Sequence, residues 1–314
     1  MTKTAFLFPG QGSQAVGMGR AVFDASAAAR EVLETVNTSL DEDLGAIMLG
    51  GPEDSLRMTR NAQPALMTTA LACVREIETR LGRTIDTIGD AAAGHSLGEY
   101  AALAAVKSLD IATAASLLRL RGDAMQNAVP VGEGAMAALL GVNLDQVEAM
   151  LASRDWIALD IANDNAPGQV VISGSVADID TALEMAKENG IRRAVKLPVS
   201  APFHCRLMAP AADAMAEALA GVTLHLPSLP VWSNVTARPV DDPAELRENL
   251  ITQVTGMVRW RETLENMAAD GITRFVEIGT GKVLAGLVKR TLPDAEAMSI
   301  EGPEDVDGFL NSIA

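Results

Sequence analysis

The strongest chemical signal in the sequence is Ser96, at the centre of the stretch GHSLGEYAAL at residues 94–103. Residues 94–98 read G-x-S-x-G, a spacing typical of a sharp strand-to-helix turn that exposes a serine hydroxyl. Small residues on both sides let the chain turn tightly. The helix that follows places free backbone N–H groups near the serine, where negative charge is favoured. The pattern therefore indicates a nucleophilic serine.

A serine hydroxyl is a weak nucleophile until a base takes its proton, and three histidines could supply that base. His95 adjoins Ser96, and neighbours on a sharp turn point in different directions. His225, in VTLHLPSLP, alternates like a strand residue and suits a structural part. His204 follows a proline-bearing turn in VSAPFHCRLMAP and precedes a helix, a common place for a functional residue. We therefore expect His204 to be the base. No single carboxylate stands out as its partner, and a neutral carbonyl could orient the ring instead.

Two arginines in LLRLRGDAM form the next candidate pair. Arg119 and Arg121 are two residues apart on a predicted helix, so their side chains face different ways. An arginine that reaches a pocket suits a carboxylate, because its planar fork binds two oxygens at once. The alternative for either arginine is a solvated surface position.

The two cysteines, Cys73 and Cys205, form no spaced pair, so neither a disulfide framework nor a zinc site is indicated. We expect Cys205, which adjoins His204, to be a small packed residue rather than a reactive thiol.

Two glycine-rich stretches raise a nucleotide-binding alternative. GQGSQA at residues 10–15 matches G-x-G-x-x-A, which would indicate a dinucleotide site. That site needs a second strand ending in an acidic residue about 20 positions later. The segment 25–36, ASAAAREVLETV, has a helical pattern instead. GTGK at residues 279–282 lacks the full phosphate-loop spacing and is followed by Val283, so we interpret it as a strand-to-helix turn.

Composition limits the class of protein. The 314 residues are 48% apolar and carry a net charge of −16. No apolar run approaches the ~20 residues of a membrane helix. The opening MTKTAFLFPG has too short an apolar region for a secretory signal. We do not expect nucleic acid to be a partner, because binding phosphates needs a basic face. We expect a cytoplasmic protein with no bound metal and no association with a membrane.

The predicted elements alternate between strands and helices. The opening TAFLFPGQGSQ predicts a short buried strand that ends in a glycine turn, and residues 87–106 predict strand, turn and helix. Further helices are predicted at 25–40, 61–82 and 110–128. Pro64 lies near the start of the second, where proline is tolerated. GKVLAGLVKRTL, at 281–292, is predicted as the last helix. Such alternation favours an α/β fold with a mainly parallel sheet.

A different pattern begins near residue 130. A strand at 134–141 and a helix at 143–153, with Asn143 as its start signal, are followed by two strands within 156–174. A helix that ends before Gly190 and a strand at 191–200 complete the order β-α-β-β-α-β, which is the ferredoxin-like arrangement. We predict that residues 128–198 form a small subdomain, inserted into a large domain made of residues 1–127 and 199–314.

Six stretches, taken together, resemble the malonyl-CoA:acyl carrier protein transacylases of fatty-acid synthesis, over nearly the whole chain. They are FPGQGSQ, GHSLGEYAAL, RLRGDAM, NAPGQVVISG, LPVSAPFHCRLM and EIGTGKVLAG. Their order and spacing are far more specific than the serine motif alone. The resemblance implies a hydrolase-like α/β large domain with a ferredoxin-like insert, in agreement with the predicted elements.

The resemblance also implies a role for individual residues. These are the nucleophile Ser96, the base His204, the carboxylate-binding Arg121, the oxyanion-hole N–H groups of Gln11 and Leu97, the histidine-orienting carbonyl of Gln253, and Phe203. Phe203 would crowd out a branched α-methyl group, as in the malonyl-type signature of related polyketide acyltransferases. The match around Gln253 is looser than elsewhere.

The implied reaction carries the malonyl group of malonyl-CoA to the phosphopantetheine thiol of acyl carrier protein through a malonyl-Ser96 ester. Such ping-pong exchange requires no metal and no redox cofactor. Both partners are acidic, as is this chain, so a local basic patch is required for their attraction. The candidates are Arg192, Arg193 and Lys196 in the insert, and Lys282, Lys289 and Arg290 near the C-terminus.

Other functions remain open at this point. A serine hydrolase such as a thioesterase would share Ser96 and His204, but needs neither Arg121 nor an acceptor thiol. A polyketide-type acyltransferase acting in trans would share all the motifs. A non-catalytic module that binds carrier protein would form no acyl-serine at all.

Overall fold

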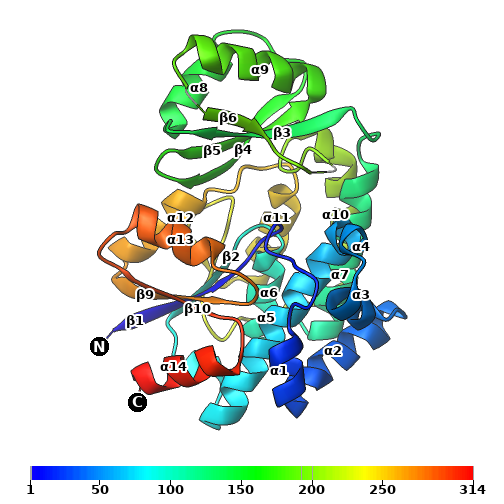
Figure 1. Ribbon diagram of the computed structural model, residues 1–314, viewed down its shortest axis with the longest axis vertical. Helices are drawn as coiled ribbons and strands as arrows, with labels where there is room; N and C mark the ends of the chain where they lie inside the picture. The colour runs from blue at the N-terminus through cyan, green and yellow to red at the C-terminus, as the bar shows by residue number, and fades with distance from the viewer. Residues whose placement is uncertain (1, 192, 200, 314) are drawn as a thin grey trace.

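The computed structural model describes residues 2–191, 193–199 and 201–313, and two sheets organise them (Figure 1). The larger sheet has six strands in the order β10-β9-β1-β2-β7-β8, and the smaller has four in the order β4-β5-β3-β6. All neighbouring strands of the larger sheet are parallel except β7 and β8, whereas those of the smaller sheet are antiparallel. The predicted α/β class with a mainly parallel sheet and an α+β insert is confirmed.

The strands of the larger sheet are β1 (Lys3–Phe8), β2 (Ala91–Gly94), β7 (Val231–Trp232), β8 (Pro239–Val240), β9 (Ile272–Ile278) and β10 (Glu296–Ile300). Before the small sheet, the helices are α1 (Arg20–Ala25), α2 (Ala27–Leu40), α3 (Leu44–Gly50), α4 (Glu53–Arg57), α5 (Thr59–Leu81), α6 (Gly98–Ala105) and α7 (Ile111–Asn127), with a 3₁₀ turn at Ile85–Thr87. After it come a 3₁₀ turn at Arg206–Met208 and α10 (Ala209–Ala220), α11 (Pro243–Gln253), α12 (Trp260–Ala269), α13 (Val283–Thr291) and α14 (Pro303–Ile313).

The central strand β1 explains why helices cover both faces of the larger sheet. Its side chains alternate between the two faces, as in any strand. Phe6 and Phe8 pack into the core that includes α2, α5, α6 and α7, while Ala5 and Leu7 pack into a second core with α12 and α13. A strand that is buried on both faces reads as a continuous apolar run, which is what the opening residues show.

The small sheet consists of β3 (Gly134–Leu140), β4 (Leu159–Ala166), β5 (Gln169–Ser175) and β6 (Arg193–Lys196), with helices α8 (Leu144–Ala152) and α9 (Val176–Glu188). The predicted β-α-β-β-α-β order is therefore confirmed. The Asn143 start signal of α8 is a full capping box with Gln146. Figure 1 shows α8 and α9 on the side of this sheet away from the larger sheet. The limits 128–198 of the subdomain stay a prediction.

Pro64 lies deeper in its helix than the sequence pattern suggested. The helix begins at Thr59, so Pro64 is its sixth residue rather than a first-turn residue. Proline has no N–H, so the carbonyl of Arg60, four residues earlier, loses its helical partner. The guanidinium of Arg119 donates to that carbonyl at 2.8 Å and replaces the missing bond. This tertiary hydrogen bond compensates for a proline position that helix preference alone disfavours.

Two other expectations about elements were wrong. The helix after GTGK is not the last, because strand β10 and helix α14 follow it. β10 is an edge strand with partly exposed side chains, so it lacks a clear alternation of apolar residues. The segment around His225 forms no strand; its side chain is exposed, and its backbone N–H donates to Ser108. Two predictions are confirmed. GTGK forms the turn between β9 and α13, and residues 27–40 form helix α2 rather than the strand that a dinucleotide site needs.

Candidate active site

Ser96 lies on the sharp turn between β2 and α6, and its backbone has a φ of +53°. The two glycines of the motif permit this turn because nothing larger fits. A Cβ on Gly94 would lie 1.9 Å from the backbone of Gly98, and a Cβ on Gly98 would lie 2.2 Å from the carbonyl oxygen of Phe8. The motif is therefore a packing requirement of the strand–turn–helix junction, and the serine that it carries lines the cleft described below.

Asn234 holds the strained turn in place, and sequence reasoning did not identify it. Its Oδ1 accepts from the backbone N–H of Ser96 at 2.7 Å, and its Nδ2 donates to the carbonyl of Gly94 at 2.7 Å. One side-chain amide thus satisfies both sides of the turn. Asn234 follows β7, the neighbour of β2 in the sheet, so only the strand order brings it to the serine.

The hydroxyl of Ser96 and the ring of His204 meet across 108 residues of sequence. Ser96 Oγ lies 2.8 Å from His204 Nε2. On the other side of the ring, Nδ1 lies 2.8 Å from the backbone carbonyl of Gln253 and 3.2 Å from that of Gly256. Carbonyls only accept, so the ring hydrogen resides on Nδ1 and Nε2 presents its lone pair to the hydroxyl. The neutral carbonyl considered as an alternative to a carboxylate is what the structure contains.

Burial keeps the imidazole neutral. His204 is 3% exposed, and burial together with the positive charge of Arg121 lowers its pKa from 6.5 to about 3. Both causes penalise the imidazolium, because a cation loses hydration on burial and repels a second cation. The ring is therefore in its proton-accepting form at neutral pH.

Arg121 points into the same site rather than to solvent. Its guanidinium is 1% exposed, and its Nη2 donates to Ser96 Oγ at 3.1 Å. The side-chain oxygens of Gln63 and Gln253 accept from its two terminal nitrogens at 2.8 Å each. No carboxylate among the described residues forms an ion pair with Arg121. The guanidinium is thus held by neutral amides, with its charge uncompensated by a direct partner.

Gln63 and the side chain of Gln253 were not predicted as arginine holders. Gln253 was expected through a carbonyl that orients the histidine, and the carbonyl in contact is that of the backbone, which any residue type would supply. A glutamine is needed at this position only for its side-chain amide, which accepts from Arg121. Gln63 lies in α5, where no motif distinguishes it from other polar residues of the helix.

The backbone N–H groups of Gln11 and Leu97 are free to bind an oxyanion. Both residues line the cleft, and within the described part of the chain neither N–H has an acceptor. The loop of Gln11 is fixed by its side chain, which accepts from Thr59 Oγ1 at 2.7 Å. Leu97 directly follows the serine at the start of α6, where N–H groups point out of the helix.

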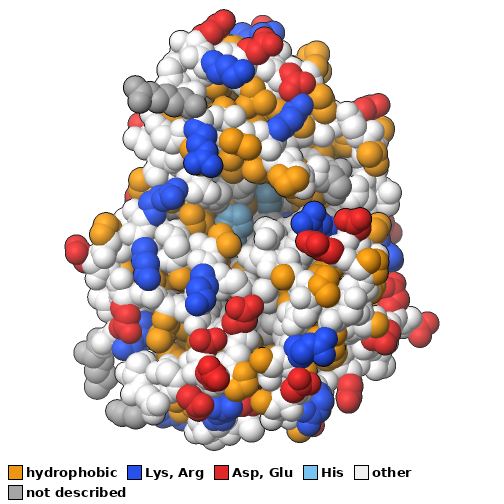
Figure 2. All heavy atoms as spheres, in the orientation of Figure 1, with side chains coloured by type: hydrophobic (Ala, Val, Ile, Leu, Met, Phe, Trp, Pro, Cys, Tyr) orange, Lys and Arg blue, Asp and Glu red, His pale blue; other side chains and the backbone are white. Residues whose placement is uncertain are grey.

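These groups line a cleft of about 650 Å³ between the two sheets. Figure 2 shows the hollow, with histidine side chains at its floor. One wall comes from the inner face of the small sheet, where Met136 and Ala138 alternate with Ala137 and Leu139 of the small core. Phe203, which is 8% exposed, lies in the wall beside His204. The cleft has room for an acyl group and an extended thiol arm.

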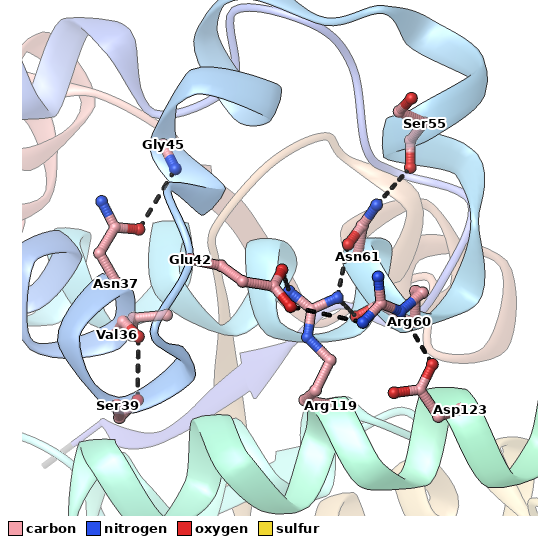
Figure 3. Close-up of polar contacts among 10 residues, drawn as sticks. All are labelled: Val36, Asn37, Ser39, Glu42, Gly45, Ser55, Arg60, Asn61, Arg119 and Asp123. Atoms are coloured by element: carbon pink, nitrogen blue, oxygen red, sulfur yellow. Dashed lines mark hydrogen bonds and ion pairs between the residues drawn. The ribbon is translucent and has the colours of Figure 1, made fainter.

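Arg119 is also buried, so solvated surface was wrong for both arginines. Its guanidinium turns away from the cleft into a polar cluster, shown in Figure 3. It donates to Glu42 at 2.8 Å and to the side chain of Asn61 at 2.5 Å, besides the Arg60 carbonyl. Arg60 in turn pairs with Asp123 at 2.8 Å. This cluster joins the start of α5 to α7, the helix that carries Arg121.

The side chains of His95 and Cys205 make contacts other than with the hydroxyl of Ser96. His95 Nε2 bonds to Asn165 Oδ1 at 2.8 Å, and its ring packs on Trp260, so it is turned away from the hydroxyl of Ser96. Cys205 is buried as expected, and its thiol donates to the Pro202 carbonyl. Across the described residues, we find no group of three or more side chains placed to hold a metal ion and no helix that could span a membrane.

The two basic clusters are exposed where they are described. Arg193 and Lys196 lie on β6, and Lys196 pairs with Asp180 at 2.6 Å. Lys282, Lys289 and Arg290 lie at either end of α13 and are exposed. Arg192 falls outside the described residues. Figure 2 shows lysine and arginine side chains along one side of the hollow.

Known proteins share the sequence and the overall fold of this chain. Residues 5–304 match the family described as acyl transferase domain. The malonyl CoA-acyl carrier protein transacylase of Bacillus subtilis is 41% identical over 315 residues, which cover 100% of this chain and 98% of that protein. The crystal structure of an acyl-carrier-protein-S-malonyltransferase from Bartonella henselae has a TM-score of 0.95 and 46% identity, covering 99% of each chain.

A third similar structure contains a partner protein. It is a type II PKS acyl-carrier protein in complex with its malonyl-transacylase, whose transacylase has a TM-score of 0.94 and 35% identity over 99% of this chain and 100% of that one. Both the sequence relatives and the solved structures extend over essentially the full length. The chain therefore belongs to the malonyl-CoA:acyl carrier protein transacylase family.

Proposed function

We propose that Ser96 is the residue through which this chain carries out malonyl transfer, with His204 as its base and Arg121 as the group that binds the substrate's free carboxylate. The chain transfers the malonyl group of malonyl-CoA to the thiol of acyl carrier protein, the step that supplies malonyl units to fatty-acid synthesis. One observation carries the assignment of residues: the hydroxyl of Ser96 lies within hydrogen-bond distance of both a neutral imidazole and a buried guanidinium.

In the first half-reaction, Ser96 Oγ attacks the thioester carbonyl of malonyl-CoA while its proton passes to His204 Nε2. The carbonyl oxygen becomes an oxyanion, which accepts from the N–H groups of Gln11 and Leu97. Loss of one such donor typically costs on the order of 10²–10³ in rate. The C–S bond then breaks, coenzyme A leaves with the proton from His204, and a malonyl ester remains on Ser96.

The second half-reaction runs the same steps with a new thiol. The thiol of acyl carrier protein gives its proton to His204 and attacks the ester carbonyl. The tetrahedral adduct collapses with release of Ser96 Oγ, which regains the proton from the imidazolium. Because one thioester replaces another and the proton is returned, the cycle uses no metal and no redox cofactor.

Arg121 supplies selectivity for a diacid. Its Nη1 has a second N–H that donates to no described residue, and its Nη2 already reaches Ser96. A malonyl carboxylate that approaches this N–H would receive a charge-assisted hydrogen bond from the buried cation. A methyl group in the same place would leave the buried cation unpaired, so acetyl is rejected as well as malonyl accepted.

Intact-mass measurement tests this assignment. After mixing with malonyl-CoA, the chain should gain the mass of one malonyl group, and peptide mapping should place it on Ser96. Ser96→Ala should gain nothing, while His204→Ala should gain it far more slowly. A malonyl group on another residue, or none on the unmodified chain, contradicts the proposal.

A serine hydrolase would share the first half-reaction and differ in the second. Release of coenzyme A should therefore be measured with and without acyl carrier protein bearing its thiol. A transacylase shows one equivalent of release without the carrier and continuous release with it. Continuous release to water alone would favour a hydrolase.

A further inference from the structure

Glu99 is a buried carboxyl group beside the active site to which the reaction gives no part. It lies in the first turn of α6, three residues after Ser96, and its side chain is fully buried. One oxygen, Oε2, accepts from the side-chain Nε2 of Gln253 at 2.7 Å and from the backbone N–H of Asn234 at 3.3 Å. Its other oxygen has no partner among the residues that the structure describes. A buried carboxyl with an unpaired oxygen is costly, so its presence calls for a reason.

The contact with Gln253 decides which way that amide faces. An amide has a donating end and an accepting end, and the two fit different partners. Nε2 of Gln253 donates to Glu99 and to the Ser96 carbonyl at 3.0 Å, so Oε1 is turned to Arg121 at 2.8 Å. With the amide reversed, its NH₂ would face a guanidinium that has no acceptor, and its oxygen would face a carboxyl. Together with the Ser96 carbonyl, which only accepts, Glu99 therefore disfavours the orientation that would release Arg121.

We propose that Glu99 is a positioning residue for malonyl recognition, which acts by accepting from Gln253 Nε2 and so presents Gln253 Oε1 to the guanidinium of Arg121. This inference rests on the proposed function, because it assigns Glu99 to the same carboxylate-binding site. Glu99 touches neither the hydroxyl of Ser96 nor the ring of His204, so its influence passes through Gln253.

The role belongs to the acceptor oxygen rather than to the negative charge. Burial raises the pKa of Glu99 to about 7, against the opposing effect of its hydrogen bonds and of Arg121. The neutral and the ionised form of this carboxyl are therefore closer in free energy at neutral pH than they are for an exposed glutamate. A carbonyl oxygen is available to Gln253 in both forms. A glutamine at position 99 keeps such an oxygen, and a leucine of similar size does not.

The alternative is a structural role through Asn234, whose N–H also reaches Glu99. Asn234 holds the serine turn, so damage by that route would slow acylation by every acyl group alike. Loss of the contact that passes through Gln253 to Arg121 would slow malonyl transfer far more than acetyl transfer, because only malonyl carries a free carboxylate. The ratio of malonyl to acetyl transfer therefore separates positioning from mere structure.

The experiment compares Glu99→Gln and Glu99→Leu with the parent chain, using malonyl-CoA and acetyl-CoA. We expect Glu99→Leu to raise KM for malonyl-CoA and to lower the malonyl-to-acetyl ratio of kcat/KM by about tenfold or more, the usual effect of one lost hydrogen bond to a charged network. Glu99→Gln should keep the ratio within about threefold of the parent, since it retains the acceptor. Equal losses for both acyl groups, or equal damage in both variants, would overturn the proposal.

Glu277 provides a matched control. It is a fully buried glutamate with one unpaired oxygen and one that accepts from the backbone N–H of Ala285 at 2.8 Å. It does not line the cleft. Glu277→Leu should lower the melting temperature and leave the malonyl-to-acetyl ratio unchanged. Should Glu99→Leu fail to fold, Glu99→Met, whose flexible chain fills similar space, replaces it.

A double-mutant cycle with Gln253→Leu tests the route. If Glu99 acts through Gln253, Glu99→Leu lowers the ratio no further in the Gln253→Leu background, whereas independent effects add. Additive losses contradict the route. Absence of malonyl on Ser96 in the parent chain would instead remove the proposed function itself, which distinguishes the two failures.

Discussion

The ring Nδ1 of His204 lies 2.8 Å from the backbone carbonyl oxygen of Gln253, so a peptide group orients this imidazole. A carbonyl fixes the ring tautomer as a carboxylate would, but it brings no negative charge that would stabilise an imidazolium. The side chain of the same residue holds Arg121 at 2.8 Å. One residue at the end of α11 thus contacts the proposed base through its backbone and the proposed substrate-binding arginine through its side chain.

A variant that removes only the side-chain amide of Gln253 should reveal that division. Gln253→Leu removes the amide and keeps the backbone carbonyl, so we expect acylation of Ser96 by acetyl-CoA to stay within about threefold of the parent and that by malonyl-CoA to fall about tenfold or more. Gln63→Leu should have the same pattern, because it holds the other end of Arg121. The measurement is the mass-shift rate with each thioester. A similar loss with acetyl-CoA would show that the side chain also serves the base.

Replacement of Arg121 should slow the transfer of malonyl, the dicarboxylic acyl group, more than the transfer of acetyl. Arg121→Ala is expected to reduce kcat/KM for malonyl-CoA by at least about a hundredfold, as for the loss of a charge-assisted pair, with a smaller loss or a gain for acetyl-CoA. Arg121→Lys keeps the charge without the planar fork and should recover only part of the malonyl activity. Steady-state kinetics with both thioesters gives the ratio. Equal losses for the two would remove Arg121 from carboxylate binding.

The lowered pKa of His204 predicts an acid-tolerant base. A neutral ester such as p-nitrophenyl acetate reports acylation of Ser96 without the carboxylate site. Its rate should not fall between pH 8 and pH 5, because the imidazole is still unprotonated well below its ordinary value of 6.5. In Arg121→Ala, loss of the neighbouring cation raises the pKa and moves the acid limb upward. An acid limb near pH 6.5 in the parent chain would contradict the argument.

The lowered pKa of His204 should also make the free energy of unfolding depend on pH. The folded chain excludes a proton from His204 that the unfolded chain binds below pH 6.5. The free energy of unfolding should therefore fall as the pH is lowered through 6.5 towards 3. His204→Gln should reduce this slope in urea titrations at several pH values. An unchanged slope would show that other groups control acid unfolding.

The glycine at position 98 should be intolerant of any side chain. Gly98→Ala places a Cβ 2.2 Å from the Phe8 carbonyl oxygen and forces α6 away from β1, which we expect to cost about 3 kcal/mol or more of unfolding free energy. Gly286→Ala is the matched control. It lies at an exposed position of helix α13 with no atom within 4 Å of the added Cβ, and the substitution should stabilise the fold by about 0.5–1 kcal/mol. Urea denaturation measures both, and comparable stability of the two variants would contradict the packing argument.

Carrier-protein docking should depend on local charge. Charge reversal at Lys282, Lys289 and Arg290 is expected to raise KM for acyl carrier protein severalfold while leaving acylation by malonyl-CoA unchanged, and added salt should weaken the difference. Reversal of Arg193 and Lys196 tests the other cluster. A cluster whose reversal leaves KM for the carrier unchanged takes no part in docking.

Much of this protein follows from local sequence alone. The serine turn could be predicted because its glycines, strand and helix are contiguous, and the ferredoxin-like order could be predicted because each element carries its own periodicity and start signals. His204 could be nominated by elimination among three histidines. The family resemblance then supplied Arg121, Gln11 and Leu97, whose spacing alone distinguishes none of them.

Other features depend on contacts between distant segments. Asn234 and Gln63 lie in stretches with no distinctive pattern, and Glu99 lies within the serine motif stretch, where nothing singles it out. Each gains its part only when the strand order and helix packing bring its partners to the site. The burial of Arg119 depends in the same way on α5, whose Pro64 leaves a carbonyl for it to bind. Local sequence determines elements because their preferences are short-range. The partners of a buried polar group are decided by tertiary structure, because burial removes water and leaves only neighbours from remote parts of the chain to satisfy it.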